Sequence, residues 1–209
     1  MTLLIENQYF GTVNYYKMLF QYTYTNIEQC EFYQKLSFRN RCMVPGANGV
    51  IQLSVPLENG RNQRSLIKEV KIAYKDNWVL QHCRSLDACY NRAPFFEFYR
   101  DELFELLETR PIFLFDLNLS LMNWVLKKLK ANLDIQLTKV YDPNPPIEVF
   151  DARNIIVPKN QDTYSNFINY TQVFEDRIGF KPNMSILDLL FCVGPNRAFH
   201  LLKSNEISN

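Results

Sequence analysis

The sequence lacks the features that would direct a protein to a membrane or to nucleic acid. Its formal net charge is only +1, from 23 basic and 22 acidic residues, so no overall field attracts polyanions. No window holds the roughly 18 uninterrupted apolar residues of a transmembrane helix. The N-terminus has no basic segment followed by an apolar run and a small-residue cleavage site, so no signal peptide is indicated. We therefore expect neither an integral membrane segment nor a nucleic-acid partner.

Cysteine, histidine and glycine are scarce or scattered, which argues against several common catalytic centres. The five cysteines form no Cys-x-x-Cys pair and no His/Cys spacing suited to a metal, and their odd number fits reduced thiols in the cytoplasm. There is no glycine-rich phosphate loop, no Gly-x-Ser-x-Gly elbow, no His-Glu-x-x-His motif and no acidic metal cluster. These absences speak against P-loop enzymes, hydrolases with that elbow and zinc enzymes. They predict no metal site and leave any cofactor unidentified.

Aromatic residues are abundant, with 16 Phe and 12 Tyr in a chain of 209 residues. They suit an aromatic core, and some could line a cleft for a carbohydrate or a nucleotide. A hydrophobic share of 47% and a charged share of 22% are ordinary for a globular protein, and the length favours one domain over residues 1–209. Residues 141–180 are too few for a second domain, and we expect them to form a loop-rich excursion.

Hydrophobic periodicity and turn residues predict an α/β fold, with a mixed sheet, an N-terminal strand–turn–helix, an antiparallel hairpin and several packing helices. The expected strands cover residues 1–5, 31–42, 50–55, 66–73 and 135–140. In the strand over residues 66–73, the candidate core residues are Ile67, Val70 and Ile72. The expected helices cover residues 13–21, 77–90, 93–108, 114–130 and 186–193. Asp76 or Asn77 is expected to cap the second of them. Asn48-Gly49 is typical of a tight hairpin turn, and Gly194-Pro195 is expected to end the last helix.

Residues 31–42 carry the most informative pattern of the chain. Read as a strand with a two-residue period, they place polar side chains on one face, namely Glu31, Tyr33, Lys35, Ser37, Arg39 and Arg41. The other face would pack on the core with Phe32, Gln34, Leu36, Phe38, Asn40 and Cys42. Guanidinium groups match phosphate or carboxylate oxygens, so the polar face predicts a site for a small anionic substrate. The same pattern also fits a solvated outer face of alternating charge.

Polar residues between the first strand and the first helix are further candidates for substrate binding. Gln8, Tyr9 and Asn14 fall at this corner, and open α/β sheets bind ligands at the carboxyl ends of their strands. Polar side chains at such corners also serve to cap backbone groups, so a purely structural role is the alternative.

The helix expected over residues 77–90 contains one of the two histidines and one of the two tryptophans. Trp78 and His82 are four residues apart and therefore share a face. His82 is the first choice for a general base, because its side chain titrates near neutrality without perturbation. The structural alternative is a buried histidine satisfied by its neighbours. His200 is assigned a structural role.

Three motifs resemble those of the WbqC-like family of bacterial proteins. They read Gln8-Tyr9-Phe10, Lys35-Leu-Ser-Phe38-Arg-Asn40-Arg41 and Ser185-Ile-Leu-Asp-Leu-Leu-Phe191-Cys-Val-Gly194, and together they span nearly the whole chain. Where the family usually has proline after the glutamine, this chain has Tyr9. The resemblance implies a cytoplasmic protein of surface polysaccharide (O-antigen) biosynthesis that transfers an amino acid such as glycine, or another acyl group, to a sugar or nucleotide sugar.

Such a reaction gives the candidate residues roles. Binding of a nucleotide sugar or a carboxylate-bearing substrate is expected from Gln8, Tyr9, Asn14, Tyr33, Arg39, Asn40, Arg41 and Trp78. Catalytic roles are expected for His82, Lys35 and Glu31. In these roles His82 would deprotonate a sugar amine or hydroxyl, and Lys35 would neutralise developing charge. Glu31 would orient one of the cations or, more simply, pair with Lys35.

Two other functions fit the same residues. The cationic segment would serve a non-catalytic module that binds a nucleotide sugar or a biosynthetic partner equally well. The N-terminal strand, polar turn and helix also suit a nucleotidyltransferase-like enzyme, although the two-histidine signature expected there is absent. The polar segments 58–65 and 160–178 are candidates for a flap and a lid over the site. The sequence does not indicate an oligomeric state.

Overall fold

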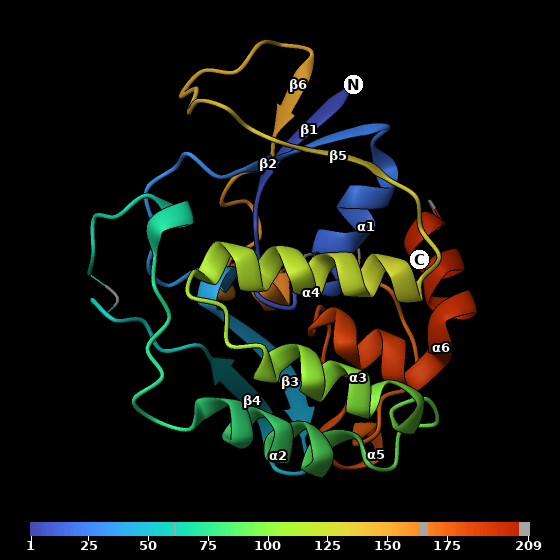
Figure 1. Ribbon diagram of the computed structural model, residues 1–209. Coiled ribbons are helices and arrows are strands. Elements are labelled where there is room, and N and C mark those ends of the chain that lie inside the picture. The colour runs from blue at the N-terminus through green and yellow to red at the C-terminus, as the bar shows by residue number, and fades with distance from the viewer. Residues whose placement is uncertain (61, 164–166, 205–209) are drawn as a thin grey trace.

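A parallel sheet of four strands forms one end of the molecule (Figure 1). The computed structural model describes residues 1–60, 62–163 and 167–204. The strand order is β5-β2-β1-β6, with β1 at Thr2–Glu6, β2 at Tyr24–Glu28, β5 at Asp134–Leu137 and β6 at Val149–Asp151. Leu4 of β1 pairs with Asn26 on one side and with Asp151 on the other. Because neighbours cover both sides of β1, this strand is central, and its side chains from Leu4 to Glu6 are buried.

The predicted N-terminal strand–turn–helix is confirmed. Helix α1 (Val13–Gln21) follows β1 after a short turn, and the Thr12 hydroxyl caps it by accepting a hydrogen bond from the amide of Tyr15. The helix packs against α6 (Ile186–Lys203), whose first turn is capped by the Ser185 hydroxyl. Gly194, with φ of 76°, bends α6 before Pro195, and the helix then continues where the sequence predicted its end.

The predicted antiparallel hairpin is also confirmed, as β3 (Arg41–Gly46) paired with β4 (Gly49–Ser54). Gly49 has φ of +128°, a backbone conformation that glycine adopts without a steric penalty. The hairpin lies at the opposite end of the molecule from the parallel sheet and packs against α2 (Trp78–Tyr90) (Figure 1). The Asn77 side chain caps α2, as expected for this helix start.

The remaining helices are α3 (Glu97–Glu108), α4 (Leu114–Lys128) and the single turn α5 (Glu175–Ile178). Helix α3 begins four residues later than predicted, because residues 91–96 form turns. The strand expected over residues 66–73 is wrong: Ile67–Glu69 is a short 3₁₀ helix, and its neighbours form only isolated bridges. The predicted inward residues Ile67, Val70 and Ile72 are nevertheless buried.

The strand predicted over residues 31–42 is wrong as well. A turn at residues 35–36 interrupts it, Phe38–Asn40 forms a 3₁₀ helix, and β3 begins only at Arg41. The Ser37 hydroxyl stabilises this turn by donating to the carbonyl of Gln34 at 2.6 Å and accepting from the amide of Arg39. The predicted faces are wrong in part: Glu31 and Arg39 are buried, whereas Phe32 and Leu36 are exposed. Phe38 and Cys42 are buried as predicted.

Leu36 has a left-handed backbone conformation, with φ of 57°, although its side chain is 60% exposed. We expect Leu36→Gly to raise the free energy of unfolding by roughly 0.5–1 kcal/mol, because the relief of strain exceeds the entropy that glycine adds to the unfolded chain. Chemical denaturation would measure the gain. Leu36→Ala keeps the strain and is the matched control, and equal stability of the two variants would show that the backbone is unstrained.

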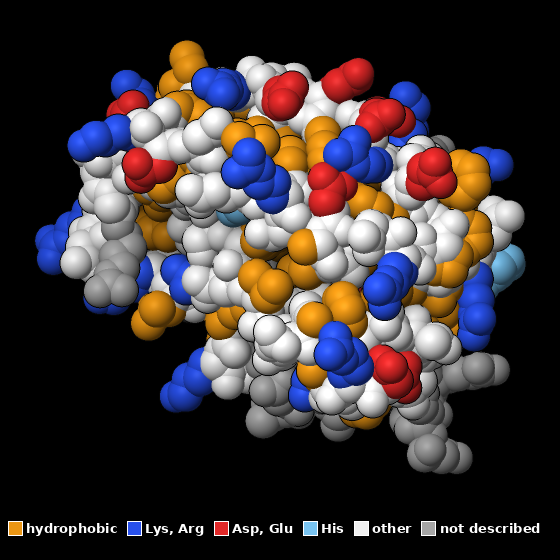
Figure 2. Space-filling model, turned by 90° about the horizontal axis from the view of Figure 1, so that it is seen from below, with side chains coloured by type: hydrophobic (Ala, Val, Ile, Leu, Met, Phe, Trp, Pro, Cys, Tyr) orange, Lys and Arg blue, Asp and Glu red, His pale blue; other side chains and the backbone are white. Residues whose placement is uncertain are grey.

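Surface charge is mixed on the face that Figure 2 shows, where cations and carboxylates alternate among hydrophobic side chains. This agrees with the formal net charge of +1. Among the helices that the structure describes, none is long and apolar enough to cross a bilayer.

Candidate functional site

The carboxyl ends of β1 and β6 meet at the point where the sheet topology changes direction. The chain passes from β1 to β2 on one side and returns to the other side of β1 at β6. Open α/β sheets bind ligands at such a switch point. Here the carboxylate of Glu6 accepts hydrogen bonds from Nε2 of Gln8 at 2.7 Å and from the amide of Asn154 at 2.9 Å. Polar groups that follow β1 and β6 thus lie together at the carboxyl end of the sheet.

The last residue of β2, Glu28, adds a second buried carboxylate at the carboxyl end of the sheet. Oε1 of Glu28 accepts from the amide of Cys30 and from the hydroxyl of Thr138, each at 2.7 Å. Its Oε2 accepts from Nη1 of Arg153 at 3.2 Å, and Arg153 also pairs with Asp151 of β6. The side chains of Glu28 and Arg153 are 1% and 5% exposed, and this network ties the ends of β2 and β6 together.

Arg39 and Glu31 form a buried ion pair beside these carboxylates. Nε of Arg39 donates to Oε1 of Glu31 and Nη2 donates to Oε2, both at 2.7 Å, and the two side chains are 0% and 4% exposed. The third nitrogen, Nη1, is buried without a hydrogen-bond partner among the described residues. Burial raises the pKa of Glu31 to about 7 against the charge of Arg39, and the carboxylates of Glu6 and Glu28 raise it further.

Amide side chains connect Arg39 to β1 through helix α4. Nδ2 of Asn118 donates to the carbonyl of Arg39 at 2.7 Å, and Nδ2 of Asn7 donates to the carbonyl of Phe115, one turn earlier in α4, at 3.2 Å. Oδ1 of both asparagines and Oε1 of Gln8 are buried and have no partner in the described part of the chain. We name Asn7, Gln8, Arg39 and Asn118 the edge cluster. Buried polar atoms left unpaired in this way mark places where a further polar group can bind.

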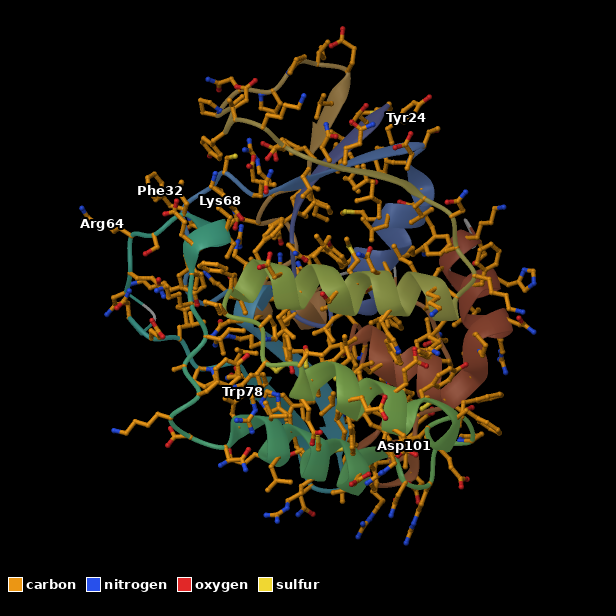
Figure 3. All side chains as sticks on the ribbon, viewed as in Figure 1. Tyr24, Phe32, Arg64, Lys68, Trp78 and Asp101 are labelled. Atoms are coloured by element: carbon orange, nitrogen blue, oxygen red, sulfur yellow. The ribbon has the colours of Figure 1, made fainter. Side chains whose placement is uncertain are left out.

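Tyr9, His82 and Trp78 form a separate cluster between β1 and α2. The hydroxyl of Tyr9 lies 2.9 Å from Nδ1 of His82, and the ring centroids of Trp78 and His82 are 5.0 Å apart. Burial lowers the pKa of His82 to about 4, although a hydrogen bond to the backbone of Ser54 raises it. Trp78, at the start of α2 (Figure 3), also stacks on Tyr74. Where the Tyr9 hydroxyl donates to Nδ1, this nitrogen accepts no proton from a substrate until the hydroxyl leaves it.

Tyr33, Asn40 and Arg41 lie together where the 31–40 segment joins the hairpin. The hydroxyl of Tyr33 donates to Oδ1 of Asn40 at 3.0 Å, and Nδ2 of Asn40 donates to the carbonyl of Val55 at 2.9 Å. Burial raises the pKa of Tyr33, while the charges of Arg41 and Arg39 lower it. The side-chain amide of Asn40 thus joins the 31–40 segment to Val55, which follows the hairpin. Arg41 is the only cation among these three residues and is partly exposed.

Asn14 and Lys35 lie apart from these groups. Asn14 is buried in the first turn of α1, where its backbone amide donates to Oδ1 of Asn183 at 3.0 Å. Lys35 is exposed in the turn that replaces the predicted strand. The expectation that Glu31 pairs with Lys35 is wrong, because Glu31 pairs with Arg39; its other expected role, holding a cation, matches this contact.

The sequence prediction missed Asn7 and Asn118. Asn118 carried a signal, since it sits four residues after Leu114 and three before Leu121, on the apolar face of a helix, where a buried asparagine needs a partner. Within the ranges that the structure describes, no group of three His, Cys, Asp or Glu side chains could hold a metal ion. The suggested flap and lid include residues 61 and 164–166, which lie outside those ranges.

Comparison with known proteins gives one match. The model of the WbqC-like protein family matches residues 7–148, more than half of the chain. This range begins directly after β1 and includes the 31–42 segment, α2 and α4, with all four residues of the edge cluster. No curated protein and no solved structure matches the chain.

Proposed function

The chain belongs to the WbqC-like protein family, and we propose that it is a cytoplasmic transferase of surface polysaccharide biosynthesis. Its substrate is an anionic sugar such as a nucleotide sugar, which receives an amino acid such as glycine or another acyl group. The edge cluster binds this substrate. The observation that carries the proposal is the buried guanidinium of Arg39, which Glu31 holds by two nitrogens while Nη1 has no partner among the described residues.

The chemistry of the edge cluster suits a phosphorylated sugar. A guanidinium fixed by two hydrogen bonds is already oriented. An N–H group of its unpaired nitrogen can therefore donate a hydrogen bond to a phosphate oxygen with little loss of side-chain entropy. The unpaired amide oxygens of Asn7, Gln8 and Asn118 are acceptors that match the hydroxyl groups of a sugar. All four side chains are at most 2% exposed, and a charge-assisted hydrogen bond is stronger there than in water.

The segment after β6 controls access to this site. The amide of Asn154 bonds to Glu6, and the carbonyl of Ile156 accepts from Nε2 of Gln8 at 3.4 Å. A hydrogen bond of that length is weak. A substrate that replaces the Ile156 carbonyl at Gln8 would thus compete with a weak contact, while the shorter bond at Asn154 keeps the segment anchored.

A non-catalytic module that binds nucleotide sugars is the second candidate. It is favoured by the positions of the expected catalytic residues, since His82 is 5% exposed and bonded to Tyr9, and Lys35 lies in an exposed turn. Both functions use the edge cluster for binding. They differ in turnover: only a transferase forms product when the purified protein, a nucleotide sugar and an activated amino acid or acyl-CoA are combined.

A thermal-shift screen with nucleotide sugars, acyl-CoA compounds and amino acids tests the binding step. We expect nucleotide sugars to raise the melting temperature in a concentration-dependent way, because a ligand that binds the folded state stabilises it by mass action. Arg39→Lys keeps the charge but loses the free nitrogen, and we expect it to weaken binding about tenfold or more. Arg100→Lys is the matched control, since Arg100 forms the same two-bond pair with Asp87 on the surface. Equal binding by both variants, or no stabilising nucleotide sugar, would contradict the proposal.

A further inference from the structure

Two large hydrophobic side chains are exposed in the turn that interrupts the 31–42 segment. Phe32 is 59% exposed and Leu36 is 60% exposed, and Leu36 holds its position with a strained φ of 57°. A strained leucine that is not packed in the core has no evident role in stability, and such residues concentrate at functional surfaces. We name residues 32–36 the turn tip.

Cations surround the turn tip. An isolated antiparallel bridge joins Phe32 to Leu66, and the amide of Tyr33 donates to the carbonyl of Ser65 at 2.9 Å. This pairing places Arg64 and Lys68 two residues to either side of the bridge, and Figure 3 shows both on the same side of the molecule as Phe32. Lys35 lies within the turn tip itself, and all three cations are exposed. Glu69, next to Lys68, is the one acidic side chain in the segment 62–69.

We propose that the turn tip, together with Lys35, Arg64 and Lys68, docks the protein onto an anionic lipid surface. Phe32 and Leu36 would enter the boundary between headgroups and acyl chains, and the three cations would lie at the level of the anionic headgroups. The two apolar side chains thus match the acyl-chain boundary, and the three cations match the headgroup layer. Buried apolar area and attraction between basic side chains and anionic headgroups both strengthen peripheral membrane binding.

A lipid surface fits this patch better than a protein partner does. A specific protein interface buries about 800 Å² on each partner around an apolar centre, which two side chains at a turn cannot supply. A bilayer needs no complementary shape and accepts a convex tip. The formal net charge of the whole chain is only +1, which provides little attraction to anionic lipids, so the attraction has to come from this local group of cations.

The patch lies on the side of the molecule toward which the parallel strands run. Strand β2 starts at Tyr24 and leads toward Phe32, and Figure 3 shows these two residues at opposite sides of the sheet. Docking would therefore turn the carboxyl ends of the strands toward the bilayer. The inference rests on the turn tip and its cations alone and does not require that the edge cluster bind a nucleotide sugar.

Cosedimentation of the full chain with vesicles tests the inference. We expect binding to vesicles of mixed phosphatidylcholine and phosphatidylglycerol, little binding to phosphatidylcholine alone, and release at about 1 M salt, where the Debye length falls to about 3 Å. The variant Phe32→Ser with Leu36→Ser should lower the partition coefficient about tenfold or more. Phe98→Ser on α3, where the side chain is 75% exposed, is the apolar control and should bind like the wild type.

A charge-matched pair of variants separates the local cations from net charge. Lys35→Gln, Arg64→Gln and Lys68→Gln in one chain should abolish the preference for phosphatidylglycerol. Arg84→Gln, Arg92→Gln and Lys127→Gln remove the same charge from other exposed positions and should leave it intact. Equal loss in the two triple variants, wild-type binding by the double serine variant, or no vesicle binding by the wild type would overturn the inference. Binding of an acidic protein at the turn tip without vesicle binding would also overturn it.

Discussion

Replacing Glu31 by leucine is expected to lower the free energy of unfolding by about 3–5 kcal/mol, because it leaves the charge of Arg39 buried and unpaired. The guanidinium of Arg39 is 0% exposed and can reach no water without moving. The change is best measured by urea denaturation at about pH 8, above the folded-state pKa of Glu31 of about 7, so that the carboxylate is ionised in both the folded and the unfolded wild-type chain.

Two controls identify the buried charge as the cause. The double variant Glu31→Leu with Arg39→Met should recover about 3–5 kcal/mol relative to Glu31→Leu alone and so be at least as stable as the wild type, because no charge then remains at this pair. Asp87→Leu breaks the exposed pair with Arg100, whose side chains are 37% and 41% exposed, and should cost about 1 kcal/mol or less. If the double variant were no more stable than the single one, packing rather than charge would explain the loss.

Lowering the pH from 7.5 to 5 is expected to reduce the contribution of His82 to the free energy of unfolding by about 2 kcal/mol. This follows because the pKa of His82 is about 4 in the folded protein, against an ordinary value of 6.5. A lowered folded-state pKa means that the neutral ring is preferred in the folded protein. The contribution is therefore complete above pH 6.5 and is lost as the pH falls toward 4. The measured quantity is the difference in unfolding free energy between the wild type and His82→Gln at the two pH values.

The comparison with His82→Gln is needed because other buried groups change the free energy of unfolding in the opposite direction as the pH falls. Burial raises the pKa of Asp188 to about 6 and that of Glu31 to about 7, so both carboxyls favour the folded state as the pH falls. These contributions are common to the wild type and to His82→Gln and cancel. His200→Gln removes the exposed histidine and serves as the control. A wild-type advantage over His82→Gln that is the same at pH 7.5 and pH 5 would show that the His82 ring is solvated.

The elements that the sequence predicted correctly are those whose signals are local. The cap of α2 at Asn77, the Asn48-Gly49 turn of the hairpin and the apolar run of β1 each depend on neighbouring residues. The 31–42 segment failed because its alternation is real but is interrupted by the turn that Ser37 stabilises. Before the turn the alternation holds but with the opposite face inward, because Glu31 is buried and Phe32 is exposed. After the turn Phe38–Asn40 forms a 3₁₀ helix whose residues are all buried, so the two-residue period no longer applies there.

The site was less predictable because it depends on contacts between distant segments. Arg39 is buried because α4 covers it, and the bond between its carbonyl and Asn118 spans 79 residues. No local pattern indicates that an arginine in a polar stretch will lie in the core. The sequence did identify Arg39, Gln8 and Glu31 as candidates, and the structure brings polar groups of all three to the carboxyl ends of β1 and β2. Their roles in binding and catalysis remain predictions.

The structure of the protein in complex with the nucleotide sugar that stabilises it most would test the central claim, which is that the edge cluster binds an anionic sugar. We predict a phosphate oxygen within hydrogen-bond distance of Nη1 of Arg39 and a sugar hydroxyl on the side-chain oxygen of Asn7 or Asn118. A phosphate held instead by Arg41 on the hairpin, or by Lys75 and Arg110 in the pocket beside Tyr74, would contradict the account.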